Sequence, residues 1–447
     1  MGATSAKQEK PRKPKNEADL SKIPARVDNV IVKGLLRTYD DYVMRTAQDL
    51  FKADNFQDVI IEVNNARQYL SDLGIFKEIS VHIDISRGEK ASPNGYQITF
   101  EGIELSRIIG QVGTEIGQSE GSFKTELSSP NLFGRGERLT LQGSYSYFRT
   151  SDLILKLSKG FYHTRFLYNR PEISLSLFRH SNAVPISEYK NQNLGILADF
   201  TFYTLWPIDL LHSIQYESSF REISLLKKTA PFFIREQCGP RMASLIRHIV
   251  QFDSRDSNIF PTYGVYAKTL NEFAGGGLGG NIGYMLNDTH FEINIPLILG
   301  CSMQFSSRFG MIQKDKKSPS VPISSLFNLG GSMSLRGFEW GGAGPQRQGV
   351  ATGAHSYWSS GMHFWAPLPF KSSLGRFSEN FRTHLFYNFG NCNSFSTDKM
   401  KSAAGIGLAY KFANQARIEV NYCIPLDKEK GDRVCRGFQF GIGCDFI

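Results

Sequence analysis

The sequence has no run of about 18 apolar residues, the length that a transmembrane helix needs, anywhere in its 447 residues. This absence excludes a helical membrane span. Residues 1–25 also lack the apolar core of a secretory signal and the Arg-rich amphipathic pattern of a transit peptide, so we expect no cleaved leader. A β-strand crosses a bilayer with about 9 to 11 alternating residues, and such strands need no long apolar run.

Motifs for catalysis and metal binding are missing as well. There is no HExxH, no GxSxG and no Cys/His ligand spacing, and the six cysteines form no CxxC pair. The glycine-rich stretch 330–345, GGSMSLRGFEWGGAGP, lacks the lysine and following Ser/Thr of a P-loop. GLGGNIG (277–283) precedes a strand pattern instead of a helix. We therefore expect neither an enzyme nor a cofactor or metal.

A strong charge of one sign is absent too. The net charge is +9, and a large share of the excess lies in residues 1–26, which have the composition of a solvated tail. Nucleic-acid binding requires a basic patch on a folded surface, so we expect no nucleic-acid partner. Glycine and aromatic residues are plentiful, with 42 glycines and 13% aromatics, and this composition favours strands and turns over helix bundles.

Three segments are predicted along the chain. Residues 1–25 form a disordered tail. Residues 26–105 have the order β-α-α-β-β, with Val59, Val63, Ala66 and Leu70 on one helical face, and predict a small α+β domain. Residues 107–447 lose the helical period and alternate apolar with polar residues, as in ARIEVNY (416–422), where Ile418, Val420 and Tyr422 alternate with Arg417, Glu419 and Asn421.

About sixteen alternating segments occur in residues 107–447, beginning near 108, 121, 137, 152, 172, 191, 211, 242, 262, 281, 301, 355, 381, 402, 415 and 436. Sixteen strands without a repeat are too many for one soluble sandwich. A membrane barrel places the apolar face in lipid and the polar face in a wet lumen, and its closure removes the edge strands. The pattern therefore predicts a mainly β protein with a sixteen-stranded transmembrane barrel.

The β-α-α-β-β unit, the sixteen-strand pattern and LRGF (335–338) resemble the BamA-type superfamily of outer-membrane assembly proteins. PNLFGRG (130–136) and FDSRDSNIFPTYG (252–264) look like two turns of that family. The single N-terminal unit and the missing signal resemble the barrel subunit of the mitochondrial sorting and assembly machinery. The resemblance covers residues 26–447. It implies a POTRA domain in the intermembrane space, a barrel integral to the mitochondrial outer membrane, and partners that comprise unfolded β-barrel precursors, other assembly subunits and membrane lipid.

The resemblance also implies that the LRGF loop folds back into the lumen, anchored by Arg336, Gly337 and Phe338. A guanidinium inside a barrel needs partners, and its five donors can tie a loop to a rigid strand. The expected wall positions hold His363 and Asn388 where the bacterial pattern has acids. We therefore expect a neutral hydrogen-bond set around Arg336, with Asp253 or Asp256 as candidate acids.

The first and last barrel strands are rich in glycine, which weakens strand pairing. The first contains Gly110, Gly113 and Gly117, and the last contains Gly441, Gly443 and Phe446. This seam predicts a lateral gate whose open edge could pair with an incoming strand. QFGIGCDF (439–446) also fits the sorting signal of mitochondrial barrels. The predicted function is insertion of barrel precursors into the membrane. The alternative is a pore for proteins or metabolites.

Overall fold

The computed structural model describes residues 20–87, 91–117, 120–146, 150–161, 170–204, 208–316, 321–368, 375–412 and 416–443. The chain divides into two compact units, residues 1–107 with 130–136, and residues 108–129 with 137–447. The segment 130–136, which we predicted as a barrel turn, therefore groups with the first unit. Hydrogen bonds explain this grouping, because Asn131 Nδ2 donates to Thr38 Oγ1 (2.8 Å) and Tyr39 N donates to Gly134 O (3.0 Å).

The first unit is a three-stranded sheet with helices. Its elements are β1 (Arg26–Lys33), α1 (Asp40–Met44), a 3₁₀ helix (Arg45–Lys52), α2 (Phe56–Asp72), β2 (Phe76–Ile85) and β3 (Gly95–Glu104). The strand order is β1-β3-β2, with β1 parallel and β2 antiparallel to β3. The predicted helical face of Val59, Val63, Ala66 and Leu70 is buried, and the side chain of Asn55 caps α2 by accepting from Asp58 N.

The last residues of the predicted tail are structured. Leu20–Lys22 forms a 3₁₀ helix and Ala25 is buried. Ala25 N donates to Asp54 O (3.2 Å), and Phe56 N donates to Ile23 O (2.9 Å), so this segment is held against the start of α2. Backbone pairing therefore orders residues 20–25, although their composition is that of a tail. Residues 1–19 of the predicted tail lie outside the described residues.

Glu104 at the end of β3 organises the connection between β1 and α1. Its carboxylate accepts hydrogen bonds from Leu36 N (3.1 Å), Thr38 N (3.0 Å) and Thr38 Oγ1 (2.6 Å), and from Arg37 Nε (3.2 Å). Burial alone would raise the pKa of Glu104, but these hydrogen bonds outweigh burial and lower the pKa to about 2. The carboxylate must therefore be charged for this connection to hold.

The depressed pKa predicts a pH dependence of the first unit. Because the folded-state pKa lies below the unfolded value, the stabilisation is fully present above about pH 4.5 and is lost as the pH falls towards 2. We expect the protection factors of the β1 and β3 amides in the full chain, which are corrected for the intrinsic exchange rate at each pH, to fall over this range, and those of E104Q to lie below wild type already at pH 6. Equal protection of wild type and E104Q at both pH values would contradict this role.

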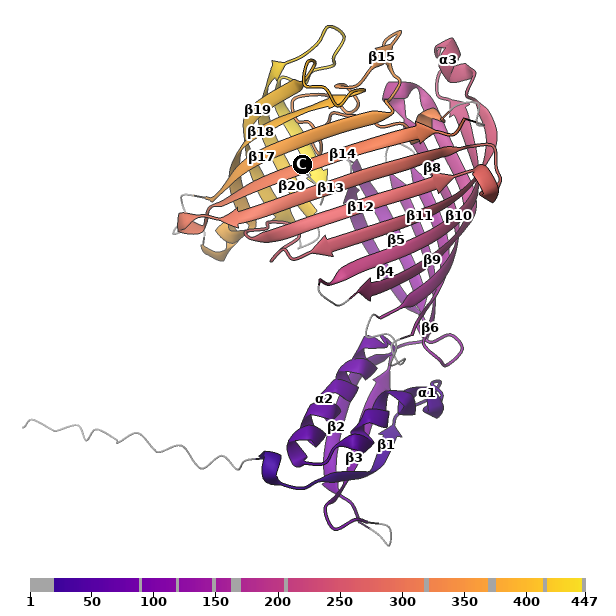
Figure 1. Ribbon diagram of the computed structural model, residues 1–447, viewed down its shortest axis with the longest axis vertical. Coiled ribbons are helices and arrows are strands. Elements are labelled where there is room, and N and C mark those ends of the chain that lie inside the picture. Colours follow the sequence, from indigo (N-terminus) through magenta and orange to yellow (C-terminus); the bar gives the residue numbers. More distant parts are fainter. Residues whose placement is uncertain are drawn as a thin grey trace, which may run out of the picture. The chain divides into compact units, whose positions relative to one another are not determined.

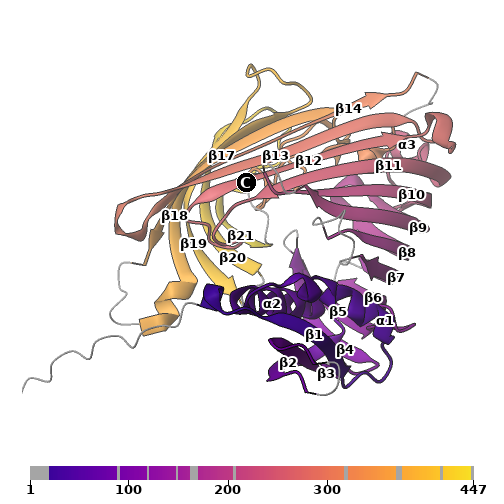
Figure 2. The same cartoon turned by 60° about the horizontal axis from the view of Figure 1, so that its bottom comes forward.

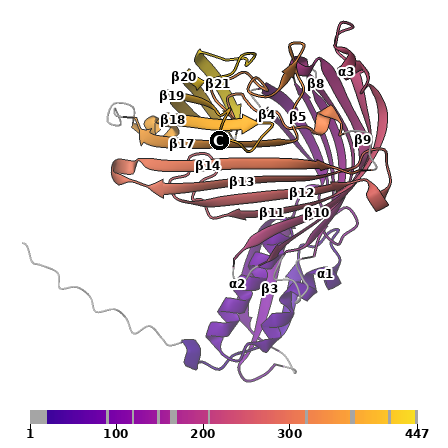
Figure 3. The same ribbon diagram turned by 45° about the horizontal axis from the view of Figure 1, so that its top comes forward.

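The second unit is one sixteen-stranded antiparallel sheet that curves into a barrel (Figures 1 and 3). Consecutive strands pair, apart from the excursion between β14 and β17. The strands are β4 (Ile109–Gly117), β5 (Glu120–Ser129), β6 (Glu137–Ser146), β7 (Ser151–Gly160), β8 (Glu172–Val184), β9 (Tyr189–Thr204), β10 (Leu210–Leu225), β11 (Gly239–Asp253), β12 (Gly264–Ala274), β13 (Tyr284–Pro296), β14 (Ser302–Lys314), β17 (Ser356–Pro367), β18 (Phe381–Cys392), β19 (Lys401–Phe412), β20 (Ala416–Asp427) and β21 (Gly437–Gly443). The prediction of sixteen strands is confirmed.

Short elements lie in the connections of this unit. They are the helix α3 (Phe232–Arg235), the hairpin β15 (Gln346–Arg347) with β16 (Val350–Ala351), and the 3₁₀ helices Pro185–Ser187, Gly276–Leu278, Ile298–Gly300, Ile323–Ser325 and Gly375–Asn380. Among the described residues, none of the helices is both long and apolar enough to cross a membrane.

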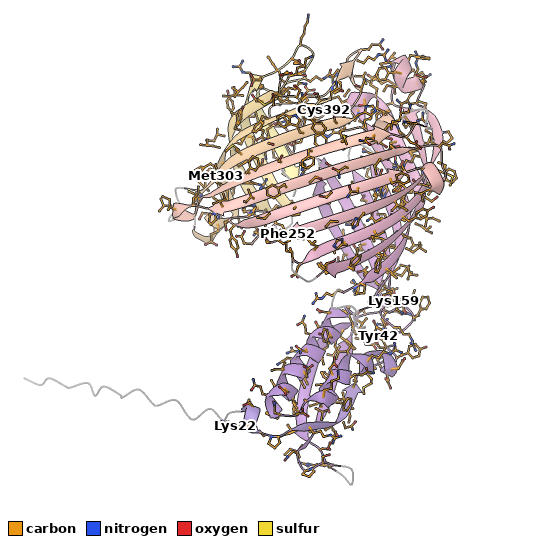
Figure 4. The ribbon with its side chains drawn as sticks, viewed as in Figure 1. Lys22, Tyr42, Lys159, Phe252, Met303 and Cys392 are labelled. Atoms are coloured by element: carbon orange, nitrogen blue, oxygen red, sulfur yellow. The ribbon has the colours of Figure 1, made fainter. Side chains whose placement is uncertain are left out.

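The two faces of the sheet differ in polarity, as the alternation predicts. On β7, the outward Leu153, Leu155 and Leu157 are exposed, whereas Lys156 faces the opposite side. Met303 of β14 and Phe252 of β11, labelled in Figure 4, belong to the same outward apolar face. Period-two alternation thus produces an apolar outer wall and a polar interior.

The sheet begins at β4 and ends at β21, and these two strands come together. Cα atoms of β4 and β21 approach within 8 Å. Within the described residues, however, no ladder of paired residues joins them, whereas every other neighbouring pair of strands has one. Figure 2 shows the terminal strands β17–β21 across the barrel from β8–β11. The only discontinuity among the described strands is therefore at this seam.

Candidate functional site: a loop anchored to the inner wall

The glycine-rich loop between β14 and β17 is buried. Leu329, Leu335, Phe338 and Ala343 have no exposed surface and pack with Tyr357, Cys392 and Ala403 of the wall strands. A loop that emerges between two strands can reach the inner wall only by folding back into the barrel. Its glycines allow this, since Gly330, Gly331, Gly337 and Gly341 all have positive φ.

Arg336 is the largest fully buried side chain of the described residues. Its Nη2 donates to Glu419 Oε2 at 2.9 Å and its Nε donates to the same oxygen at 3.2 Å. Glu419 projects inward from β20 and is itself fully buried. The guanidinium also lies over the ring of Phe386, with 5.3 Å from Cζ to the centroid. Loop and wall are thus joined by a buried, hydrogen-bonded ion pair.

Further side chains of β17, β18 and β20 surround this ion pair. Arg417 Nε lies 2.8 Å from Glu419 Oε1, and Asn421 Nδ2 donates to Glu419 Oε2 at 2.9 Å. One carboxylate therefore faces two guanidinium groups and one amide. The ring of His384 contacts Asn421 Oδ1 at 2.8 Å and stacks on Trp365 with 4.2 Å between centroids. Arg336 binds one carboxylate oxygen of Glu419 and Arg417 lies beside the other, so both oxygens face a guanidinium group.

The two residues after Arg336 bind the last strand. Gly337 N donates to Gln439 Oε1 at 2.9 Å, and Gln439 Nε2 donates back to Phe338 O at 2.9 Å. The loop also pairs with the segment that leads into β21, because Cys435 N donates to Gly337 O and Phe338 forms a bridge with Val434. One loop segment, Arg336–Phe338, therefore holds both β20 and β21.

Of the predicted wall residues, His363 and Asn388 contact the loop, whereas Asp253 and Asp256 bind other groups. His363 Nε2 lies 3.4 Å from Arg336 Nη1, so this predicted neighbour is in place. Asn388 Nδ2 donates to Ser334 O of the same loop at 3.4 Å. Asp253 instead accepts from Arg255 (2.9 Å), and Asp256 accepts from Thr262 N (2.8 Å). Both acids therefore bind residues within the turn after β11, and the predicted contact of Asp253 or Asp256 with Arg336 is not seen in the described part of the chain.

The expectation of neutral partners for Arg336 is wrong, because Glu419 supplies a charge. The sequence placed Glu419 on the polar face of ARIEVNY but gave no reason to connect it with a loop 83 residues away. Gln439 was likewise part of the sorting-signal pattern of the last strand, without an indication that it binds the loop. For both residues, the sequence indicated only that a polar side chain on one of the last two strands faces the lumen.

The predicted gate residues lie in the two strands of the seam. Gly110, Gly113 and Gly117 lie in β4, where an added Cβ at Gly113 would meet nothing within 4 Å. Gly441 and Gly443 pair with Glu419 and Arg417 of β20. Phe446 lies outside the described residues. The glycines of β4 thus lie in an edge strand, while those of β21 lie next to the loop anchor.

A second group of charges lies on the inner wall away from the loop anchor. Glu217 binds Arg221 (2.9 Å) and Arg247 (2.7 Å), and Arg247 also binds Glu272. These residues, apart from Glu272, border a cavity of about 480 Å³. In the described part of the chain, no three His, Cys, Asp or Glu side chains are arranged to hold a metal ion. The interior is therefore polar and charged. The role that the geometry of the Arg336 site supports is to anchor the loop between β14 and β17 to the inner wall.

Residues 131–446 match the model of the Omp85 superfamily domain. The chain belongs to the Omp85 superfamily. A SAM50-like protein from Drosophila melanogaster is 54% identical over 429 residues, which are 96% of either chain. The human sorting and assembly machinery component 50 homolog is 36% identical over 438 residues, covering 94% of this chain and 90% of its own length. The predicted resemblance is confirmed.

A solved structure shares this fold. BamA from Haemophilus ducreyi lacking POTRA domains 1–3 superposes with a TM-score of 0.77 at 17% identity, over 94% of this chain and 84% of that chain. At this identity the likeness shows the fold alone. The Omp85 fold here therefore comprises a sixteen-stranded barrel whose interior holds the loop between β14 and β17.

Proposed function

We propose that this Omp85 protein is an insertase that folds β-barrel precursors into the mitochondrial outer membrane, in which its own barrel is embedded. The observation that carries the proposal is the near full-length similarity to SAM50-like relatives, among them the human sorting and assembly machinery component 50 homolog. The family supports the barrel, and the names of these relatives support a role in sorting and assembly.

The seam between β4 and β21 supports a lateral gate. Opening it would expose one row of unpaired backbone groups on each strand within the bilayer, where no water satisfies them. An incoming strand satisfies such an edge by main-chain hydrogen bonds. The interior glycines of β4 weaken its hold on neighbours, and no ladder to β21 occurs within the described residues. Gly110, Gly113, Gly117, Gly441, Gly443 and Phe446 are our proposed gate residues.

The loop anchor supports control of this gate. Arg336 is tied to β20 and Gly337 and Phe338 are tied to β21, so the loop holds the strands on one side of the seam in register. We include His363 and Asn388 in the anchor for their contacts with Arg336 and Ser334, whereas Asp253 binds Arg255 instead. Because the loop holds β20 and β21 in place, we expect β4 to be the strand that moves away when the gate opens.

The first unit is proposed to be a POTRA-like domain that faces the intermembrane space and contacts precursors or assembly subunits. Its sheet has two edge strands, β1 and β2, because β3 lies between them. An edge strand can accept a further strand by backbone pairing. This places a second, soluble strand acceptor on the same chain as the seam.

A translocation or metabolite pore is the alternative. The buried loop at residues 329–343 occupies part of the interior, which an open pore would leave to water. Depletion separates the two functions. We expect β-barrel precursors to accumulate unassembled while soluble preproteins are imported normally. Stalled soluble preproteins with normal barrel assembly would identify a pore.

A crosslink tests the gate directly. With a cysteine at Val112 in β4 and another in the final strand of an arrested barrel precursor, we expect a disulfide-linked adduct in membranes. Val112 is exposed and lies on the same strand as Gly110 and Gly113, so it is accessible without disturbing an interior contact. A cysteine at Leu155 of β7, which is also exposed, is the matched control. Equal adducts from both positions would argue against pairing at the seam.

A further inference from the structure

Six short polar residues form a stripe on the outer wall of the barrel, where most of the other side chains are apolar. We call them the outer-wall polar stripe. They lie on four successive strands of the sheet: Thr269 and Asn271 on β12, Asn287 and Thr289 on β13, Ser307 on β14 and Ser360 on β17.

Strand register shows that the stripe faces outward. Asn271 is exposed and lies two residues from Phe273, whose side chain is 45% exposed. The neighbour between them, Glu272, is 6% exposed and binds Arg247 on the inner wall. Asn271 pairs with Asn287 and Thr269 pairs with Thr289 across β12 and β13. Ser307 pairs with Phe291, which lies on the same face of β13 as Asn287 and Thr289, and with Ser360 across β14 and β17. Because directly paired residues share a face, all six point away from the lumen.

The stripe is linked by hydrogen bonds. Asn287 Nδ2 donates to Asn271 Oδ1 at 2.7 Å, and the hydroxyls of Ser307 and Ser360 lie 3.0 Å apart. Thr289 Oγ1 donates weakly to Thr269 Oγ1 at 3.4 Å. The stripe can still donate a hydrogen bond to another molecule, because the exposed amide nitrogen of Asn271 donates to no group in the described part of the chain. On β10 and β11 a histidine pair continues the polar surface, with His212 Nδ1 3.2 Å from His248 Nε2.

The stripe lies away from the strand ends. Thr269 is the central residue of β12 (Gly264–Ala274), and Ser307 is near the centre of β14 (Ser302–Lys314). Apolar rows flank it on both sides along the strands. Phe273, Met285 and Phe309 lie on one side, and Phe291, Phe305 and Met362 lie on the other. In a barrel that spans a membrane, the stripe therefore falls in the hydrocarbon layer, beyond the reach of lipid headgroups and bulk water.

We propose that the outer-wall polar stripe binds a membrane-spanning helix of a partner protein that carries neutral hydrogen-bonding side chains. The stripe has amides and hydroxyls but no charge, which matches Ser, Thr, Asn or Gln across an intramembrane contact. Ser, Thr and Asn are shorter than the flanking Phe and Met, so a narrow rod can approach the wall along the stripe more closely than over the rows. A second barrel is convex and would meet the flanking rows first.

The dimensions agree with a helix. The stripe crosses four strands, and with the histidine pair the polar surface crosses six, or about 24 Å at a strand spacing of ~4.8 Å. That length corresponds to about four turns of α-helix. The proposal requires only that the barrel spans a membrane, and it holds whether the protein is an insertase or a pore.

The experiment places a photoreactive phenylalanine analogue at Phe273, beside the stripe, in the full chain that replaces the endogenous protein. Its control is the same analogue at Phe123, an exposed outward residue of β5. After irradiation of intact membranes, we expect an adduct from Phe273 alone, mapped by mass spectrometry to a membrane-spanning helix with Ser, Thr, Asn or Gln. In the quadruple variant T269V/N271L/N287L/T289V the adduct should fall by about tenfold, the effect of two or three intramembrane hydrogen bonds. The variant T125V, an outward threonine of β5, should leave it unchanged.

Barrel stability provides the second readout, measured as the temperature at which the folded band on a cold gel converts to the unfolded band. Apolar side chains in lipid should keep this temperature or raise it in the quadruple variant. A lower unfolding temperature in the quadruple variant would show that the stripe stabilises the sheet itself, and this would overturn the proposal. An adduct to a second copy of this chain, adducts to lipid only, or an undiminished adduct in the quadruple variant would also overturn it.

Discussion

Replacing Glu419 with alanine is expected to release the loop between β14 and β17 from the inner wall. Two guanidinium groups, those of Arg336 and Arg417, would remain buried beside an empty position. Removal of one partner from a buried ion pair costs about 3–5 kcal/mol. We expect a lower unfolding temperature of the barrel in detergent and a loss of precursor assembly in membranes.

Limited trypsin digestion reports the release of the loop. Arg336 is a potential cleavage site with no exposed surface in the folded protein, whereas Arg347 in the same loop is exposed. The E419A variant should be cut at Arg336 as well as at Arg347. E419Q retains the shape and one acceptor oxygen, so its defect should be smaller than that of E419A. Protection of Arg336 in E419A at wild-type level would show that the ion pair does not hold the loop.

Replacing Gly337 with alanine is expected to have the second largest effect. Gly337 has a φ of +82°, and an added Cβ would lie 2.8 Å from the Cβ of Ala403 on β19. The left-handed backbone alone costs an L-residue about 1–2 kcal/mol. Relief of the contact moves Gly337 away from the wall, which breaks the hydrogen bonds that join it and Phe338 to Gln439. We expect loss of assembly activity with the barrel still folded.

Gly349 provides the matched control, because its φ is +76° and an added Cβ would meet no atom within 4 Å. G349A bears the same kind of backbone strain in the same connection but keeps the anchor. Assembly rates of radiolabelled barrel precursors in isolated membranes compare the two variants. An equal defect in G337A and G349A would mean that loop strain, and not contact with β19 and β21, impairs function.

The sequence was sufficient for the barrel because the information is local. Alternation over each segment specifies which residues face lipid, and this gave sixteen strands close to their observed positions, including Glu137–Ser146 and Phe381–Cys392. The turn 130–136 follows the second barrel strand, as the resemblance implies, but it groups with the first unit. Its actual partners, Thr38 and Tyr39, lie about 90 residues earlier and leave no trace in a local pattern.

The site was only partly predictable. The motif identified Arg336, and alternation put His363 and Asn388 on the inner wall. Which acid meets the arginine depends on the depth to which the loop enters the barrel and on the register of β20 with β21, and neither can be read from one sequence. Glu419 was one of several inward acids. Its burial between Arg417 and Asn421 became evident only from the assembled strands.

The measurement that most directly tests the account is a reversible lock on the seam. One cysteine in β4 and one in β21 are oxidised to a disulfide in membranes that contain the full chain, with each single-cysteine variant as control. Assembly of a newly imported barrel precursor is then followed before and after reduction. The account predicts arrest while the disulfide is closed and recovery once it is reduced. Normal assembly through a fully closed seam would contradict it.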